Sequence, residues 1–501
     1  MEFDFLASLP SVMPEVGLTF LALLVLGLDV GFFGISPLSE SRKHFIPYVA
    51  AGGMFIIAIL PLVWEPSNQL EWGGMIRHDV LSQVFKVMVI LAGGITSLIA
   101  AENSELARKG EFYLVIIVAT LGASLMSGAA DLIMVFVALE TTSIPLYILA
   151  SFRNKDLKST ESGMKYFLFG SFASAILLYG LSLLYGFSGH TNLMAIAESL
   201  NAPGFDHAIP VLISMVFIVV GFGFKISAVP FHFWTPDVYE GAPTPVTAFV
   251  SVASKAASFA LLIRFFSAVF PEMLIIDGQS IHDFWLQLVA AIAVISMTLG
   301  NLLALSQRNI KRLLAYSSIA QAGYTLIGVA AIQASSASDG IASVVFYMFM
   351  YTFTNLLAFG VIVIFAEATG SDDIADLAGL NRRNSWMALA MTIALLSLGG
   401  IPPAAGFFGK FFLFNAAVHA NLEWLAIIGV LNAIVALYYY LVVIKVMYVD
   451  VNEDVDKPIS LSLNATWLLG VVTIIVIILG VIPNRIFDWA REGAEAFITL
   501  L

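Results

Sequence analysis

Three lysines and one glutamate stand inside long apolar runs of the chain, where an ionised side chain is costly. Lys225, Lys255 and Lys410 lie well within such runs, and Glu140 lies within another. On insertion scales a lysine near the centre of a membrane helix costs roughly 2.5–3.5 kcal/mol, so three cost on the order of 8–10 kcal/mol. Pairing with Glu140, loss of the lysine proton and hydration in an internal cavity would each offset that cost. All three are components of a proton path.

Simpler roles for the ionisable residues stay open at this stage. Glu140 and one lysine could form a static ion pair that fixes helix packing. Lys165 lies one turn inside its apolar run, so a place in the proton path and a place at the membrane interface are equal alternatives. Lys86 and Arg264 lie nearer the ends of their runs. We expect both to extend their charged groups to the interface and to be structural.

Two of the apolar runs are interrupted by proline and glycine close to a lysine. Lys225 and Pro230 occur together in GFGFKISAVPFHFWTPDVYEGAPTPV, and Pro402 and Pro403 precede Lys410 in LSLGGIPPAAGFFGKFFLF. Proline removes a backbone donor and clashes with the preceding turn. At membrane depth the freed backbone groups are tolerated only where protein or water satisfies them. The breaks therefore indicate polar or hydrated sites beside Lys225 and Lys410, with a simple packing kink as the alternative.

The composition indicates that membrane helices position these residues. The chain has 501 residues, 59% of them hydrophobic and 12% charged, and its mean hydropathy is +0.93. Soluble domains carry about 25% charged residues. We predict an all-α polytopic membrane protein with about 14 transmembrane helices, because apolar runs long enough to cross roughly 30 Å of hydrocarbon occur that often. The predicted spans are 11–32, 45–64, 80–101, 112–128, 129–150, 163–188, 210–231, 245–269, 284–305, 310–333, 341–367, 386–418, 422–447 and 463–483.

Lysine and arginine are distributed unevenly between the connections. The connections after odd-numbered spans hold 14 of them, whereas those after even-numbered spans and the C-terminal tail hold 3. Because basic residues favour the inner side, we expect the odd connections inside and both termini on the outer side. Glu2 and Asp4 precede the first span, so we expect a retained helix rather than a signal peptide.

The two breaks fall in the seventh and twelfth predicted spans, five spans apart. Interrupted helices at corresponding positions of two halves are typical of transporters built from inverted repeats. We predict four parts: an N-terminal three-helix segment (1–110), two five-helix repeats (111–270 and 284–448), and a C-terminal helix with its tail (463–501). In this scheme Glu140 corresponds to Gln321, which either bridges a water chain or bonds across helices. We expect the charged tail to contact lipid headgroups or a neighbouring subunit.

Missing residue types exclude several chemistries. The chain has no cysteine, which excludes disulfides, thiolate metal sites and iron–sulfur ligation. The seven histidines lie mostly in connections or at span ends, so a haem-binding bundle is not expected. His232 follows the break after Pro230 and is either a gate or an interfacial residue with a satisfied hydrogen bond. No phosphate-binding loop occurs, and the net charge of −12 lies in connections and ends, so neither ATP nor nucleic acid is an expected partner.

Three segments of the chain resemble N subunits of proton-pumping complex I, the NADH:quinone oxidoreductase. They are FKISAVPFHFWTPDVYEGAPTPVTAFVSVASKAASFALLIR (224–264), RNIKRLLAYSSIAQAGYTLIG (308–328) and LSLGGIPPAAGFFGKFFLF (396–414). The likeness runs through most of residues 110–450. It implies a proton path of five residues: Glu140, Lys165, Lys225, Lys255 and Lys410. Many N subunits have histidine where this chain has Gln321, so the resemblance implies no titrating group there.

The resemblance also implies which parts lie outside this chain. N subunits hold no flavin, iron–sulfur cluster or quinone site, so those cofactors are expected in partner subunits and no redox centre is expected here. Expected partners are the other membrane subunits of complex I, including M-type and K-type neighbours, in an energy-transducing membrane such as the bacterial inner membrane. The electron donor is left open between NADH, ferredoxin and others. The alternatives are an Mrp-type sodium/proton antiporter subunit, which shares the WxPD element and the broken helices, and a scaffold that only anchors its neighbours.

Overall fold

Helices make up almost all of the regular structure in the computed structural model, which describes residues 8–31, 38–39, 42–333 and 336–499. Glu2 and Asp4, on which the expected retained first helix rests, lie outside the described residues. The helices of the first half are α2 (Met13–Val30), α3 (Ile46–Ile57), α4 (Leu60–Val63), α5 (Val80–Ala101), α6 (Gly110–Gly128), α7 (Leu132–Ala150), α8 (Leu157–Ser188), α9 (Leu193–Leu200), α10 (Ala208–Ile226), α11 (Trp234–Gly241), α12 (Thr244–Phe249) and α13 (Lys255–Val269). Those of the second half are α14 (Ile281–Ala304), α15 (Ile310–Ala330), α16 (Ala337–Thr369), α17 (Leu380–Arg383), α18 (Ser385–Gly399), α19 (Gly406–His419), α20 (Glu423–Tyr448), α21 (Leu463–Val481) and α22 (Asn484–Ile498).

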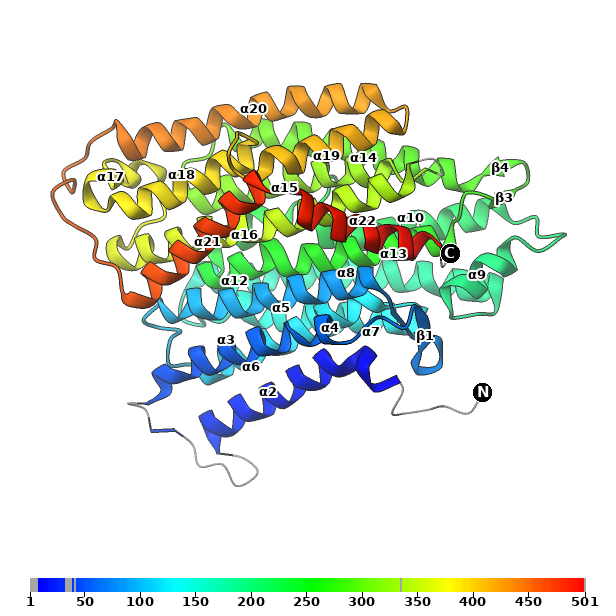
Figure 1. The fold of residues 1–501 in the computed structure, drawn as a ribbon, viewed down its shortest axis with the longest axis horizontal. Coiled ribbons are helices and arrows are strands. Elements are labelled where there is room, and N and C mark those ends of the chain that lie inside the picture. The colour runs from blue at the N-terminus through cyan, green and yellow to red at the C-terminus, as the bar shows by residue number, and fades with distance from the viewer. Residues whose placement is uncertain (1–7, 32–37, 40–41, 334–335, 500–501) are drawn as a thin grey trace.

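Short elements join the long helices. Two antiparallel hairpins are formed by β1 (Gln69–Glu71) with β2 (Ile76–His78) and by β3 (Ile275–Ile276) with β4 (Gln279–Ser280). The 3-10 turns are η1 (Leu9–Val12), η2 (Lys43–Phe45), η3 (Trp72–Gly74) and η5 (Ile374–Leu377), and η4 (Val250–Ser254) is a π-helical turn. In Figure 1 the long helices lie side by side along the long axis, with β1, β3, β4 and α9 at one end and α17 at the other. We call these the hairpin end and the α17 end.

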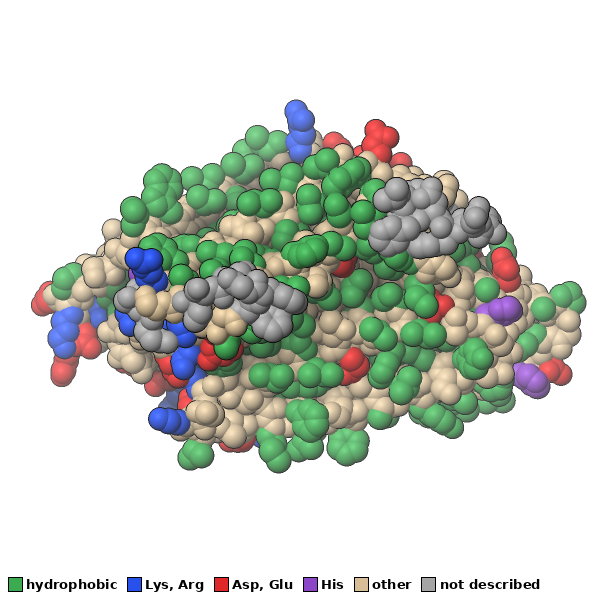
Figure 2. Space-filling model, turned by 90° about the horizontal axis from the view of Figure 1, so that it is seen from below, with side chains coloured by type: hydrophobic (Ala, Val, Ile, Leu, Met, Phe, Trp, Pro, Cys, Tyr) green, Lys and Arg blue, Asp and Glu red, His purple; other side chains and the backbone are tan. Residues whose placement is uncertain are grey.

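Thirteen helices of the described ranges are long and apolar enough to cross a membrane. The remaining predicted span, 386–418, is divided into α18 and α19, which have 15 and 14 residues and are each shorter than a span. The prediction of an all-α membrane protein with about fourteen spans is therefore confirmed. The outer surface agrees with it, because hydrophobic side chains cover the middle of the face in Figure 2 while most Lys and Arg gather toward one end.

Short polar side chains fix where several helices begin. Asp79 accepts a hydrogen bond from the Ser82 backbone N–H at the start of α5, and the Ser82 hydroxyl accepts one from the Asp79 backbone N–H. Asn309 caps α15 in the same way, and Asn384 caps α18. Each cap satisfies a backbone donor that the first helical turn leaves without a partner. The positions of the functional side chains along these helices are thereby set by local sequence.

The seventh span breaks after Lys225, as predicted. Helix α10 ends at Ile226, and Ser227 takes a left-handed conformation with φ of 63°. The chain then passes through a cis peptide bond at Pro230 before α11 begins at Trp234. The break therefore separates Lys225, in the last turn of α10, from the short helix that follows.

The twelfth span breaks before Lys410. Helix α18 ends at Gly399, Gly400 has φ of 85°, and a cis bond joins Pro402 to Pro403 before α19 begins. The first residue of α19 is Gly406, where a β-carbon would stand 1.7 Å from the Ser397 carbonyl oxygen. Only glycine fits there, because the two backbones approach too closely for a side chain.

One interruption was not predicted. The span expected at 245–269 contains the π-helical turn η4 between α12 and α13. Lys255 follows this turn directly, as the first residue of α13. Single π turns inside helices occur frequently at functional sites. All three central lysines therefore lie beside an irregular stretch of helix.

The core lies around two spans whose most apolar stretches are fully buried, Thr244–Val269 and α16. In α20 and α8 only 28% and 33% of the corresponding stretch is buried, so these helices lie at the periphery. The C-terminal helix α22 packs on α16 and α5 through Ala490, Gly493, Ala494 and Phe497. The tail therefore lies against this chain's own core, and only its polar face is free to meet the lipid or a neighbour that we expected.

Candidate functional site

The three central lysines are buried in the described structure. The exposed fractions are 6% for Lys225, 1% for Lys255 and 4% for Lys410. The lysines come from α10, α13 and α19, and each finds oxygen acceptors on a neighbouring helix or at a helix break. Charged groups at such depth need hydrogen-bond partners, since an unpaired buried charge is strongly destabilising. The partners define what each lysine can do.

Lys225 donates a hydrogen bond to the Ser143 hydroxyl on α7. Its ammonium lies 5.6 Å from the ring centroids of both Tyr147 and Phe224. Aromatic faces attract a cation, and the attraction is stronger where water is excluded. This lysine therefore sits between a hydroxyl and two rings.

Glu140 lies on α7 one turn before Ser143, is half-buried and accepts a hydrogen bond of 2.6 Å from the Ser174 hydroxyl on α8. The ion pair between Glu140 and Lys225 that the sequence suggested as one alternative is not formed in this structure. Residues three apart on a helix are neighbours on one face. Glu140 and Lys225 are therefore not in direct contact. They are linked through Ser143, which binds Lys225 and is the neighbour of Glu140 on the same face of α7.

Lys255 is held by one residue of α15. Its ammonium donates 2.8 Å to the Ser318 carbonyl oxygen and also to the Ser318 hydroxyl. The same hydroxyl lies 3.0 Å from the hydroxyl of Tyr239 on α11. A hydroxyl both donates and accepts, so Ser318 can pass a proton between a lysine and a tyrosine.

Lys410 donates hydrogen bonds to the carbonyl groups that the break of the twelfth span leaves without a helical partner. Its ammonium donates 2.9 Å to the Leu398 carbonyl and 3.1 Å to the Gly399 carbonyl, and lies 4.7 Å from the Tyr324 ring centroid. The last carbonyls of a helix have no intrahelical partner and form the negative end of its dipole. The break therefore creates the binding site for this lysine.

Gln321 connects the surroundings of Lys255 and Lys410. Its amide donates 3.2 Å to the Leu398 carbonyl, which Lys410 shares, and 3.2 Å to the Tyr440 hydroxyl. Its amide oxygen accepts from Tyr347. Tyr440 in turn lies 2.5 Å from the hydroxyl of Ser317, the neighbour of Ser318. A polar line thus runs from Lys255 along α15 to Lys410, and of the two predicted roles of Gln321 the structure shows bonding across helices.

Aromatic rings fill the space between Lys225 and Lys255. Tyr166 stacks on Trp234 with centroids 4.3 Å apart and an interplanar angle of 9°, and it meets Tyr147 edge to face at 4.9 Å. Trp234 is followed by Tyr239 at 6.4 Å, which reaches Ser318. The contacts between the first and second lysine are therefore ring against ring, whereas those between the second and third are hydrogen bonds.

Lys165 lies apart from the buried lysines, with a side chain 36% exposed. It forms ion pairs with Asp237 at 2.6 Å and Glu161 at 2.7 Å. Asp237 also binds Arg312 at 2.8 Å, and Arg312 extends the network to Glu240 at 3.1 Å. Lys165, Glu161, Asp237 and Glu240 line a cleft of about 140 Å³ between the start of α8 and α11.

Asp237, Glu240 and Arg312 were not among the predicted site residues. Burial alone would raise the pKa of Asp237, but the hydrogen bonds and charges of Lys165 and Arg312 outweigh it and hold the pKa below its usual range. The signal for Asp237 was available in the WTPD sequence, where an acid follows the broken helix at once. Arg312 could not be assigned, because its partners lie 72 and 75 residues away in the chain.

His232 is buried just after the break and its Nδ1 atom has no hydrogen-bond partner in the described structure. Its ring lies 4.6 Å from that of Phe233. Both predicted roles of His232, a gate and an interfacial residue with a satisfied hydrogen bond, stay predictions.

The expectation that Lys86 and Arg264 extend to the membrane interface is wrong. Both are 2% exposed, and each pairs with an acid that the sequence reading did not single out. Lys86 lies 2.9 Å from Glu15, and Arg264 lies 2.8 Å from Asp79. Glu15 was detectable as the acid near the start of the first span, 11–32.

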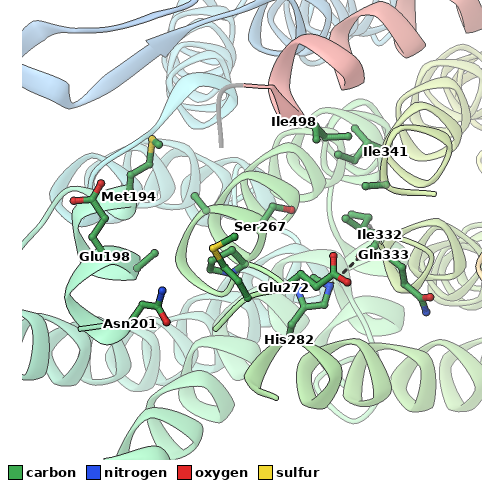
Figure 3. A pocket seen from close by; sticks show the side chains of 15 residues that line it. Met194, Glu198, Asn201, Ser267, Glu272, His282, Ile332, Gln333, Ile341 and Ile498 are labelled. Atoms are coloured by element: carbon green, nitrogen blue, oxygen red, sulfur yellow. Dashed lines mark hydrogen bonds between the residues drawn. The ribbon is translucent and has the colours of Figure 1, made fainter. Parts of the chain in front are cut away.

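A cavity of about 400 Å³ lies at the hairpin end between α9, α13, α14, α16 and α22 (Figure 3). Glu198, Glu272 and His282 are among its lining residues, together with apolar groups such as Ile341 and Ile498. None of the predicted site residues lines it. Within the described ranges no group of three or more His, Asp or Glu side chains could hold a metal ion.

Comparisons with known proteins converge on one family. The model described as NADH:quinone oxidoreductase/Mrp antiporter, transmembrane region, matches residues 129–436. The NADH-quinone oxidoreductase subunit N of Moorella thermoacetica is 41% identical over 95% of this chain and 96% of its own length. The NAD(P)H-quinone oxidoreductase subunit 2 of Nostoc punctiforme is 41% identical over 96% of this chain and 90% of its own.

Solved structures share the fold. A chain of respiratory complex I from Thermus thermophilus is 30% identical, with a TM-score of 0.76 over 95% of this chain and 99% of its own length. A chain of the Mrp complex from Dietzia sp. has a TM-score of 0.79 at 19% identity, over 98% of this chain and 97% of its own. The Mrp likeness is one of fold, whereas the likeness to the quinone oxidoreductase subunits extends to sequence over nearly the whole length.

Proposed function

Because this chain belongs to the family of membrane subunits of NADH:quinone oxidoreductases and Mrp antiporters, we propose that it is an N-type subunit that moves protons across the membrane in a redox-driven quinone oxidoreductase. The observation that carries this proposal is the row of three buried lysines, each held by uncharged oxygens beside an irregular stretch of helix. A static ion pair would need a carboxylate on each lysine. These lysines have none in direct contact, which leaves them free to take and release protons.

Protons would pass between Lys255 and Lys410 along α15. Ser318, Ser317 and Tyr440 present hydroxyl groups, which can accept a proton on one side and give one up on the other. Gln321 and the Leu398 carbonyl cannot relay a proton in this way, because an amide neither gains nor loses one at neutral pH. Gln321 is therefore a positioning residue, and the last step to Lys410 requires water or movement of the lysine side chain.

The step from Lys225 to Lys255 would be controlled by the aromatic contacts. Tyr166 and Trp234 stack in the space between the two lysines, and their stacked ring faces offer no group that binds a proton. A change in charge at Glu140 acts on Lys225 through the neighbouring positions on α7 and would alter how strongly Lys225 holds its proton. Glu140, Lys225, Lys255 and Lys410 carry the protons in this proposal, and Lys165 with Asp237 supplies ionisable groups at the surface of the α17 end.

Redox chemistry lies elsewhere in the proposed complex. The chain itself would be a non-redox subunit, and flavin, iron–sulfur clusters and quinone would be bound by partner subunits. On the basis of the basic connections we further propose that the odd connections face the inside and that both termini face the outside. The paired breaks, five spans apart, support the proposed division into two inverted five-helix repeats, 111–270 and 284–448, between the N-terminal segment 1–110 and the C-terminal part 463–501.

Isolation of the intact assembly tests the proposal. The tagged chain is purified from its native membrane in mild detergent, and the proteins that accompany it are identified by mass spectrometry. Iron–sulfur and quinone-binding subunits are expected, and the input module identifies the electron donor. Recovery with Mrp-type membrane subunits alone, together with sodium-dependent proton exchange in vesicles that lack quinone, would establish the antiporter function that the fold also permits.

A further inference from the structure

Two buried ion pairs lie near the hairpin end, outside the row of three lysines. Asp79 pairs with Arg264, and Glu15 pairs with Lys86. All four side chains are at most 7% exposed. The pairs occupy similar positions yet differ in chemistry, which allows one to be compared with the other.

The Asp79–Arg264 pair is saturated with hydrogen bonds. Arg264 binds both carboxylate oxygens of Asp79 at 2.8 Å and also donates 3.2 Å to the Ser127 carbonyl. The Phe497 ring covers the guanidinium at 5.1 Å. Burial alone would raise the pKa of Asp79, but Arg264 outweighs it and holds that pKa below its usual range. Because arginine does not lose its proton in proteins, this pair is a static joint between α5, α6 and α13.

The Glu15–Lys86 pair is not saturated. Lys86 and the Ser124 hydroxyl both bind the same carboxylate oxygen, Oε1 of Glu15, at 2.9 and 2.6 Å. The other oxygen, Oε2, is buried and has no hydrogen-bond partner among the described residues. An ionised carboxylate is normally hydrogen-bonded on both oxygens when buried. A proton on Glu15 would turn this open oxygen into the carbonyl oxygen of a neutral acid, which needs fewer hydrogen bonds.

Lys86 is able to supply that proton. Its ammonium also donates 2.7 Å to the Ser11 carbonyl, so the lysine stays in place whatever the charge of Glu15. Transfer of one proton along the 2.9 Å contact from Lys86 to Oε1 of Glu15 breaks an N–H bond, forms an O–H bond and converts the ion pair into a neutral acid and amine, with Oε2 as the carbonyl oxygen. A dry interior lowers the cost of the neutral pair relative to the charged one. Lysine, unlike arginine, makes this exchange possible.

The surroundings contain a further titratable group. Burial lowers the pKa of His78, with the Lys86 ammonium adding to the effect, against opposing contributions from Asp79, Glu71 and Glu15. His78 is on β2, next to the helix that carries Lys86. Glu111 and Tyr113 stand in the first turn of α6, far along that helix from Ser124. Among the described residues, the charged groups near the pair are therefore found on the β1–β2 hairpin and at Asp79.

We propose that Glu15 and Lys86 form a second proton-binding site, separate from the row of lysines and near the β1–β2 hairpin. The site holds its proton either on Lys86 or on Oε1 of Glu15. It does not rest on the function proposed for Glu140 and the three lysines. The Asp79–Arg264 pair, which has no open oxygen, binds no proton.

Infrared difference spectroscopy of the intact, purified complex, titrated with acid and base, tests this assignment. The unmodified complex should show a carboxylic-acid C=O band that disappears in Glu15→Gln. The same band should be absent in Lys86→Arg, since arginine keeps the ion pair and retains its proton. The band should persist in Glu140→Gln, which alters the proposed main path. It should also persist in Asp79→Asn, which alters the saturated Asp79–Arg264 pair.

The outcome decides between a proton site and a second static joint. Spectra of the unmodified complex and Glu15→Gln that are identical in the carboxylic-acid region would overturn the proposal. If Lys86→Arg does not assemble, the comparison with Glu15→Gln still gives the answer, because glutamine has nearly the same shape. Loss of the band in Glu140→Gln instead would assign it to the main path and would also overturn the second site.

Discussion

At the scale of single residues, the site is distinguished by the oxygen atoms that bind the three buried lysines. Lys255 is bound by a carbonyl and a hydroxyl, Lys410 by two carbonyls, and Lys225 by a hydroxyl. A carboxylate would hold the lysine in its charged form, whereas a neutral oxygen accepts a hydrogen bond without fixing the charge. The chemistry of the site therefore depends on partners that are themselves uncharged.

Replacement of Ser318 tests the hydroxyl relay. In Ser318→Ala, Lys255 keeps the Ser318 carbonyl, but Tyr239 loses its hydroxyl partner. A buried group left without its partner costs about 1–3 kcal/mol. We expect a complex that assembles with reduced thermal stability and slower proton pumping, measured in vesicles.

The matched control for Ser318 is Ser343→Ala. Ser343 is equally buried, on α16, and its hydroxyl bonds only the Gly340 carbonyl within its own helix. We expect proton pumping to be unchanged in this variant. Equal rates in Ser318→Ala and Ser343→Ala would show that the Ser318 hydroxyl is not part of the path.

The surface network at Asp237 predicts a dependence on pH. Although burial alone would raise the pKa of Asp237, Lys165 and Arg312 bring it below its usual range, so the folded state favours the ionised form. The stabilisation is complete above the unfolded pKa and is lost as the pH falls through the folded value. For a partly exposed network its size is at most about 1 kcal/mol. Thermal unfolding should show the native complex more stable than Asp237→Asn at neutral pH and equal to it in strong acid; a difference that persists in acid would contradict the ion-pair account.

At the scale of elements, the joint between α18 and α19 positions Lys410. A β-carbon on Gly406 would stand 1.7 Å from the Ser397 carbonyl, and the same helix end supplies the carbonyls that bind Lys410. Gly406→Ala should therefore separate the two half-helices and lower the amount of assembled complex, since overpacking costs typically 1–3 kcal/mol or more. Assembly is measured by native gel electrophoresis of solubilised membranes.

Gly186→Ala is the control for this substitution. Gly186 lies within α8 and a β-carbon there would meet no atom within 4 Å. Alanine in an open helical position stabilises by roughly 0.5–1 kcal/mol relative to glycine. Assembly should therefore be normal or improved in Gly186→Ala. Normal assembly in both variants would show that the close approach at Gly406 is not required.

Elements were predictable where a local rule decides them. Hydropathy and length gave the spans, and the prolines with neighbouring glycines gave both breaks, because these properties act over a few residues. The π-helical turn before Lys255 was missed, since VSVAS contains no proline or glycine to mark it. The helix hydrogen-bond pattern there depends on how the surrounding spans pack. The sequence of one segment does not contain that information.

At the scale of the whole molecule, long-range pairs were the part that could not be predicted. Lys86 and Arg264 were expected at the interface, but they meet Glu15 and Asp79, which are 71 and 185 residues distant in the chain. Which acid meets which base depends on how separate spans pack. Residue type alone suggested an ion pair for Glu140. In this structure Glu140 and Lys225 bind serine hydroxyls instead, because the packing of the spans decides which groups meet.

The central claim is that the buried lysines carry protons, and the ratio of protons pumped to quinone reduced tests it most directly. The purified complex is placed in sealed vesicles and compared with Lys255→Met, which removes the ammonium held by Ser318. Lys445→Met is the control, because Lys445 is 62% exposed and pairs only with Asp450 at the surface. We predict a lower ratio in Lys255→Met at normal assembly and an unchanged ratio in Lys445→Met. An unchanged ratio in Lys255→Met would contradict the proton path.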